Sequence, residues 1–190
     1  MPTRIAVLAS GGGSNLQAIL DHLASSASAH AGEVALVASD RADAGALARA
    51  RDHAIHAVAM DRALRSSGLG ALLAEHKIEL VVLAGYLRFV PAEITRNFRG
   101  RILNIHPALL PAFGGPGMFG HHVHEAVIAR GARISGATAH FVDDEYDHGP
   151  IIAQWPVPVW PNDTATALAE RVLEVEHQLY PRVVQRVCEG

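Results

Sequence analysis

The stretch Arg-Ile-Ala-Val-Leu-Ala-Ser-Gly-Gly-Gly-Ser-Asn, residues 4–15, decides the fold of this chain. Its first half, Arg4–Ala9, is a short apolar run, typical of a strand buried on both faces of a parallel sheet. Three glycines follow. Apolar residues then recur at the spacing of one helix face, at Leu16, Ile19, Leu20 and Leu23. A strand, a glycine turn and a helix in this order begin a βαβ unit.

The same alternation continues along the chain. Further strands are predicted at Glu33–Ser39, Ile55–Met60, Leu80–Ala84, Arg101–Ile105, Gly136–Val142 and Ile151–Pro158. Further helices are predicted at Gly45–His53, Leu69–His76, Pro91–Phe98 and His122–Arg130, with a last one that Asn162, Asp163 or Thr164 caps and Pro181 kinks or restarts. Pro107–Gly120 reads as a long loop. The predicted fold class is therefore α/β, one doubly wound, mostly parallel sheet in a single domain over residues 1–190.

Composition indicates an ordinary globular protein and leaves a small anionic ligand possible. Of 190 residues, 49% are hydrophobic and 18% charged, and the formal net charge is -3 without runs of like charge. We therefore expect no nucleic-acid partner. No apolar stretch reaches the roughly 18 residues of a membrane helix, and the N-terminal apolar run is too short for a secretion signal. We expect a cytoplasmic protein without a membrane partner, and the oligomeric state stays open.

The glycine turn, Ser10–Asn15, is a candidate phosphate site. At a strand–turn–helix junction the first N–H groups of the helix are free, and the helix dipole favours an anion. Leu16 stands where a dinucleotide fingerprint has its third glycine, and the Gly-Lys-Ser/Thr of a P-loop is absent. The alternative is that the glycines only form a tight turn. We favour phosphate binding because the turn follows the first strand.

Asn104 and His106 lie at the end of a predicted strand. Because they are two residues apart, their side chains point to the same side. Ligands of open parallel sheets bind beyond the carboxyl ends of the strands. An amide donor beside a titratable imidazole suits the stabilisation of an oxyanion. Considered alone, the pair is better explained by a capping asparagine and a structural histidine.

Two further polar clusters follow along the chain. The acidic segment Asp143–Gly149 offers a carboxylate that orients a water or His106, although such segments are often simple turns. The histidines His121, His122 and His124 lie together, but neither cysteine nor a regular His-x3-His spacing accompanies them. We therefore predict no metal site.

Several segments together match one ordered pattern. They are Leu8–Ile19, Val81–Arg88, Asn104–Pro111, His140–Val142 and Asp147–Pro150. In this order and spacing they resemble the phosphoribosylglycinamide formyltransferases of purine synthesis, over nearly the whole chain. The resemblance implies a Rossmann-like enzyme that transfers the formyl group of 10-formyltetrahydrofolate to the amine of glycinamide ribonucleotide, with no metal.

The resemblance also implies roles for single residues. The catalytic trio is matched by Asn104, His106 and Asp147. The loop holding the ribonucleotide phosphate is matched by Gly13, Ser14 and Asn15, and an acidic residue on the ribose hydroxyls by Glu176. The segment beside the folate is matched by Leu87, Arg88, Phe89 and Val90, together with Asn104. An arginine before the strand at 80–84 also meets the folate in this family, and the candidates are Arg62 and Arg65.

The implied mechanism is direct attack of the amine on the formyl carbon. Asn104 and a protonated His106 stabilise the oxyanion, while Asp147 orients a water or supports His106. No covalent intermediate is implied, and Cys188, the only cysteine, has no histidine partner visible in the sequence.

Two features depart from the family pattern. The segment 113–120 is longer and richer in glycine, so its conformation and its closure over a ligand stay open. His148 stands beside Asp147 where a small residue is commoner, and a charged neighbour changes the charge balance of a carboxylate.

Three other functions compete with this one. A methionyl-tRNA formyltransferase would need an added RNA-binding domain and a more basic surface. A formyltetrahydrofolate hydrolase usually carries a regulatory domain before the first strand, and the phosphate loop favours a phosphorylated acceptor over water. A non-catalytic nucleotide-binding module would explain the glycine turn but would leave Asn104, His106 and Asp147 without a joint role.

Overall fold

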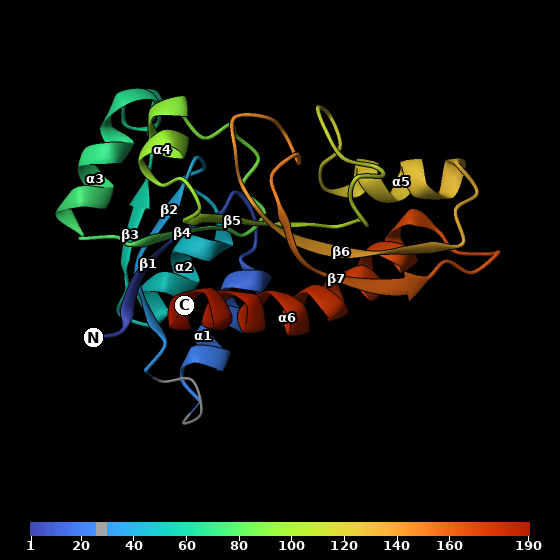
Figure 1. Cartoon of the computed structure of the whole chain (residues 1–190), viewed down its shortest axis with the longest axis horizontal. Coiled ribbons are helices and arrows are strands. Elements are labelled where there is room, and N and C mark those ends of the chain that lie inside the picture. Colours follow the sequence, from blue (N-terminus) through green and yellow to red (C-terminus); the bar gives the residue numbers. More distant parts are fainter. Residues whose placement is uncertain (26–29) are drawn as a thin grey trace.

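The computed structural model describes residues 1–25 and 30–190, and its elements follow the order expected from the sequence (Figure 1). The strands are β1 (Thr3–Leu8), β2 (Gly32–Ser39), β3 (His56–Ala59), β4 (Leu80–Leu83), β5 (Ile102–His106), β6 (Ile134–Phe141) and β7 (Ile151–Pro158). The helices are α1 (Ser14–Leu23), α2 (Gly45–Asp52), α3 (Leu69–Glu75), α4 (Ala92–Asn97), α5 (His121–Ala129) and α6 (Ala165–Glu189).

The strands form one seven-stranded sheet in the order β3-β2-β1-β4-β5-β6-β7. From β1 to β5 every pairing is parallel, whereas β6 runs antiparallel to both β5 and β7. The chain winds outward from β1 in one direction to β3, and then in the other direction from β4. The predicted doubly wound, mostly parallel α/β fold is thus confirmed, and the direction of winding changes between β1 and β4, where such folds bind ligands.

Helices cover both faces of the sheet, and alternate residues of β1 pack against the helices on opposite faces. Ile5 and Val7 pack in one apolar cluster with α1, α2 and α6. Ala6 and Leu8 pack in the other with α3 and α4. Figure 1 shows the same division, with α6 and α1 on one side of the sheet and α3 and α4 on the other. Burial of each large aliphatic side chain contributes about 1.5–3 kcal/mol, so both layers stabilise the sheet.

Two local features differ from the sequence prediction. A single π-helical turn, Leu64–Gly68, precedes α3, and the hydroxyl groups of Ser66 and Ser67 donate to the carbonyl oxygen of Ala63 there. α6 does not restart at Pro181 but continues through it, with Pro181 itself buried. Proline has no backbone N–H, so the helix loses one hydrogen bond at Pro181. This bond is one among many in a long helix, and packing against the sheet stabilises the helix on both sides of Pro181.

The start of α6 agrees with the prediction, because Thr164 is its N-cap and accepts a hydrogen bond from the backbone N–H of Ala167 at 3.1 Å. Neither α6 nor any other described helix contains a segment long and apolar enough to span a membrane.

Candidate active site

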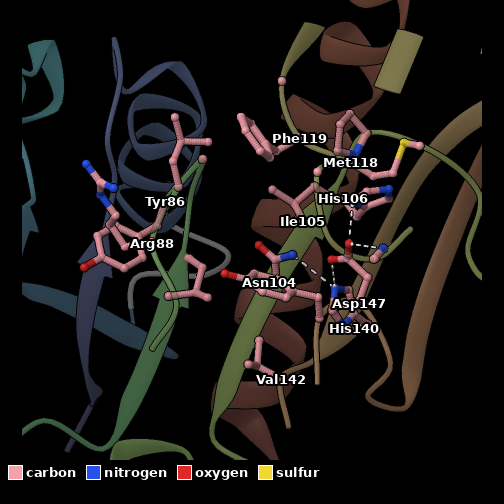
Figure 2. Close-up of a pocket in the computed structure, with 18 of the residues that line it drawn as sticks. Tyr86, Arg88, Asn104, Ile105, His106, Met118, Phe119, His140, Val142 and Asp147 are labelled. Atoms are coloured by element: carbon pink, nitrogen blue, oxygen red, sulfur yellow. Dashed lines mark hydrogen bonds and ion pairs between the residues drawn. The ribbon is translucent and has the colours of Figure 1, made fainter. Parts of the chain in front are cut away.

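A cavity of about 660 Å³ opens at the carboxyl ends of β4 and β5. Its lining includes the end of β5 from Asn104 to Pro107 and the segment 85–90 that follows β4. Figure 2 shows Asn104, His106, Asp147 and His140 gathered on one side of it. The position beyond the strand ends is the one predicted from the sheet type, and Asn104 and His106 both line the cavity as their spacing required.

His106 is almost fully buried and held from both ring nitrogens. Its Nε2 donates to the carbonyl oxygen of Phe113 at 2.8 Å, and its Nδ1 lies 3.5 Å from Oδ2 of Asp147. Burial lowers the pKa of His106 below its ordinary value, although the Asp147 carboxylate and the Phe113 carbonyl oppose this effect. Burial thus favours the neutral imidazole, and Nδ1 faces the Asp147 carboxylate.

Asp147 reaches the site from the acidic loop between β6 and β7. Its backbone has a positive φ of 54°, and its Oδ2 accepts the backbone N–H of Gly115 at 2.9 Å. Its Oδ1 lies 3.7 Å from Nε2 of His140. The loop approaches the sheet closely, because a Cβ at Gly149 would collide with the carbonyl oxygen of Phe141. Asp147 therefore lies between two histidines and also contacts the loop 113–120.

His148 is not among the residues that line the cavity. Its Nδ1 lies 2.9 Å from Oδ2 of Asp143, and the two form an exposed ion pair. The hydrogen bond to Asp143 raises the pKa of His148. The partner of His148 is thus Asp143.

The glycine turn begins α1, with Gly13 at the N-cap in a left-handed conformation, φ 77°. Asn15 lines the main cavity together with Glu176 of α6, and its Nδ2 donates to Oε2 of Glu176 at 2.7 Å. Burial raises the pKa of Glu176 to about 7, and the hydrogen bond from Asn15 only partly offsets this. The fold thus joins two predicted site residues that are 161 positions apart.

Gly13 and Ser14 are not among the residues that line the main cavity. Ser14 lines a neighbouring, more open hollow of about 590 Å³ with Gln17, Arg49 and His177. Arg49 holds the turn from outside, because its Nε donates to the carbonyl oxygen of Gly12 at 2.9 Å. The first turn of α1 thus separates the two hollows.

The predicted folate segment forms another wall of the cavity, which Leu87, Arg88, Phe89 and Val90 all line. Asp40, which follows β2, anchors this segment. Its Oδ1 accepts the hydroxyl of Ser10 at 2.5 Å, and the Ser10 oxygen accepts the backbone N–H of Leu87 at 2.9 Å. Its Oδ2 accepts Nε–H of Arg88 at 2.9 Å. Burial raises the pKa of Asp40, but the bonds from Ser10 and Arg88 outweigh it and leave the pKa below its ordinary value.

Known proteins share this arrangement. A profile described as formyl transferase matches residues 3–184. The chain belongs to the formyl transferase family. It is 46% identical, over 98% of its length, to a chloroplastic phosphoribosylglycinamide formyltransferase of Vigna unguiculata, and it spans 61% of that relative's length. It is 37% identical to the phosphoribosylglycinamide formyltransferase of Haemophilus influenzae, over 98% of this chain and 88% of that one.

A solved structure shows the same fold. The crystal structure of glycinamide ribonucleotide transformylase 1 from Symbiobacterium toebii superposes with a TM-score of 0.91 at 42% identity, over 100% of this chain and 89% of that one. The predicted family resemblance is thus confirmed, and the Rossmann-like fold of this formyl transferase with it.

Several predicted candidates lie elsewhere or keep no assigned role. Neither Arg62 nor Arg65 lines the cavity, and Nη1 of Arg65 donates to the carbonyl oxygen of Met60 at 3.0 Å. His121 and His124 line the cavity, whereas His122 does not. Among the residues outside 26–29, no three or more histidine, cysteine or acidic side chains are placed to hold a metal. Burial raises the pKa of the Cys188 thiol to about 11, which makes it a poor nucleophile.

Sequence reasoning missed two buried residues of this formyl transferase site. His140 was part of a motif without a role, and Asp40 was not singled out. Asp40 directly follows β2 and His140 lies near the end of β6, but their partners Arg88 and Asn104 lie on other elements. The only signal in the sequence was a polar residue close to the end of a predicted strand.

Proposed function

We propose that this formyl transferase moves the formyl group of 10-formyltetrahydrofolate to the amine of glycinamide ribonucleotide. One observation carries the proposal: Asn104, His106 and Asp147 meet in a cavity that Leu87–Val90 and the Asn15–Glu176 pair also line. The donors and the carboxylate that the reaction requires thus lie within one space, between walls suited to two different ligands. Relatives named phosphoribosylglycinamide formyltransferase support the same activity.

The two substrates bind to different walls of the cavity. The ribonucleotide phosphate binds at the N-terminus of α1, on Gly13, Ser14 and Asn15, where free N–H groups favour an anion. Its ribose hydroxyls donate to the Glu176 carboxylate. The folate lies along the segment 87–90, whose exposed Leu87 and Phe89 offer apolar area to its rings. The formyl group then lies beside Asn104 and His106.

The chemical step is a direct attack. The amine lone pair forms a bond to the formyl carbon, and the C=O π electrons move to the oxygen. An N–H of Asn104 and the Nδ1–H of His106 stabilise this oxyanion. The tetrahedral intermediate collapses by breaking the bond to N10 of the folate, which takes up the proton that the amine releases. Asp147 orients the water that carries this proton.

The charge of His106 changes during this step. In the free protein burial lowers the pKa of His106 and so favours the neutral imidazole, whereas the family resemblance implies a protonated one. An oxyanion close to Nδ1 adds a negative charge to that of Asp147, which lies 3.5 Å away. Two negative groups raise the pKa of an imidazole. His106 therefore takes up the proton that the amine releases as the oxyanion develops, and passes it through the ordered water to N10 of the folate when the bond to N10 breaks.

Formyl release from 10-formyltetrahydrofolate, with and without glycinamide ribonucleotide, tests the proposal. We expect turnover only when the nucleotide is present, with formylated nucleotide as the product. Formate release without nucleotide would indicate a hydrolase instead. Nucleotide binding with no folate affinity would favour a non-catalytic module.

The remaining sequence expectations stay predictions. These are one catalytic domain over residues 1–190, a cytoplasmic location, and small-molecule substrates as the only ligands. The profile match over residues 3–184 supports the first of them.

A further inference from the structure

His140 is a buried histidine that the proposed mechanism does not use. It lies on β6 directly opposite Asn104 of β5 in the antiparallel register, and only 2% of its surface is exposed. Opposite residues of an antiparallel pair present their side chains on the same face, about 4.5–5.5 Å apart at Cβ. The register therefore places an imidazole against the amide that is proposed to hold the oxyanion.

The hydrogen bonds of His140 define which nitrogen carries the proton. Nδ1 lies 2.8 Å from the carbonyl oxygen of Phe141. A carbonyl only accepts, so the hydrogen is on Nδ1 and the neutral ring has a bare Nε2. This Nε2 lies 3.1 Å from Nδ2 of Asn104. An amide nitrogen only donates, so Nε2 of His140 accepts one N–H of Asn104 (Figure 2).

The surroundings of His140 keep it in this accepting form. Burial is the largest effect on its pKa and lowers it, and the neighbouring His106 adds to this. The Phe141 carbonyl, Asp147 and Asp143 act in the opposite direction but do not reverse it. Oδ1 of Asp147 is 3.7 Å from Nε2, which is beyond a hydrogen bond. Asn104 is thus the partner of Nε2.

We propose that His140 is a positioning residue for formyl transfer: it accepts one N–H of Asn104 and so fixes how that amide faces the formyl group. The inference rests on the proposed function. The terminal torsion of an asparagine is broad and roughly two-fold, so without a partner the amide oxygen and nitrogen exchange places readily. An oxygen facing the oxyanion repels it, whereas a fixed amide keeps its second N–H for the ligand.

Two variants of His140 distinguish its role as a hydrogen-bond acceptor from its role in packing. His140→Leu has a similar volume but no acceptor, and His140→Gln keeps a carbonyl acceptor. We expect His140→Leu to lower kcat about 100-fold, the effect of a misplaced catalytic group, with both KM values unchanged. His140→Gln should recover most of the loss. His122→Leu, an exposed histidine that does not line the cavity, is the control and should keep full activity.

A double-mutant cycle shows whether His140 acts through Asn104. In the Asn104→Ala background, His140→Leu should cause no further loss of kcat, because the group that it positions is gone. Losses that multiply would overturn the inference while leaving the proposed function intact. Absence of formyl transfer by the wild type would instead overturn the proposed function, and the role of His140 in it.

A spectroscopic readout is independent of turnover. The ring ¹⁵N shifts of His140 in the wild type should show a proton on Nδ1 and none on Nε2 at neutral pH. A proton on Nε2 would overturn the inference, because that nitrogen could not accept from Asn104. If His140→Leu fails to fold, this measurement still tests whether Nε2 of His140 accepts from Asn104.

Discussion

Replacing Glu176 by glutamine should stabilise the fold above neutral pH and weaken nucleotide binding at the same time. The carboxyl is buried, and burial raises its pKa from the ordinary value of 4.5 to about 7. In the unfolded chain the group ionises near 4.5, whereas in the folded protein it must stay protonated up to about 7. Stability from this group is therefore fully present below pH 4.5 and is lost as the pH rises to about 7.

The size of this loss follows from the two pKa values. A pKa difference of one unit corresponds to about 1.4 kcal/mol. The difference between 4.5 and about 7 therefore lowers the free energy of unfolding by about 3 kcal/mol at and above neutral pH. Glutamine carries no charge, and its amide oxygen replaces the Oε2 of Glu176 that accepts from Asn15. We expect Glu176→Gln to match the wild type near pH 4.5 and to exceed its free energy of unfolding by about 3 kcal/mol at pH 8.

Urea unfolding at a series of pH values measures this difference. Glu174→Gln, an exposed glutamate on the same helix, is the matched control and should not change the pH dependence. At pH 8, where the Glu176 carboxyl is ionised, the affinity for glycinamide ribonucleotide should also fall about 10- to 100-fold, because a hydrogen bond to a charged acceptor is lost. Equal unfolding free energies for Glu176→Gln and wild type at pH 8 would refute the reasoning about burial.

Three further predictions concern the other parts of the site. Asn104→Ala should lower turnover about 100- to 1000-fold with unchanged nucleotide affinity, measured by steady-state kinetics and equilibrium binding. Asp40→Ala should release the segment 87–88 and raise the KM for 10-formyltetrahydrofolate about 10-fold, while the KM for the nucleotide stays the same. Gly13→Ala should destabilise the fold by about 1–3 kcal/mol in urea unfolding, because φ is positive and a Cβ would lie 2.7 Å from the α2 backbone. Gly11→Ala, where a Cβ meets nothing within 4 Å, is its control.

The fold was predictable because each parallel strand carries its own local signal. Runs such as Leu80–Leu83 are buried at every position, and a continuous apolar run is the pattern of a doubly covered strand. The strand predictions therefore agree with the structure to within one or two residues. The π-helical turn before α3 has no such pattern and was not predicted from the sequence.

The site was predictable only where local spacing determines geometry. Asn104 and His106 share a face because a strand has a period of two. Asp147 and Glu176 entered through the family resemblance, since nothing in an acidic turn or an amphipathic helix shows which carboxylate is buried. Asp40 was missed for the same reason, because its partner Arg88 follows a different strand.

Predicting the contact between His140 and Asn104 would require the register between β5 and β6. A slip of one residue would turn His140 to the other face of the sheet and remove it from Asn104. Thr138 pins this register: its hydroxyl donates to the carbonyl oxygen of Ala108 at 2.7 Å and accepts the N–H of Leu110 at 3.0 Å. These bonds tie β6 to the segment that follows His106. The active-site geometry thus depends on a threonine that need not touch a substrate, and this long-range pairing has no signature in local sequence.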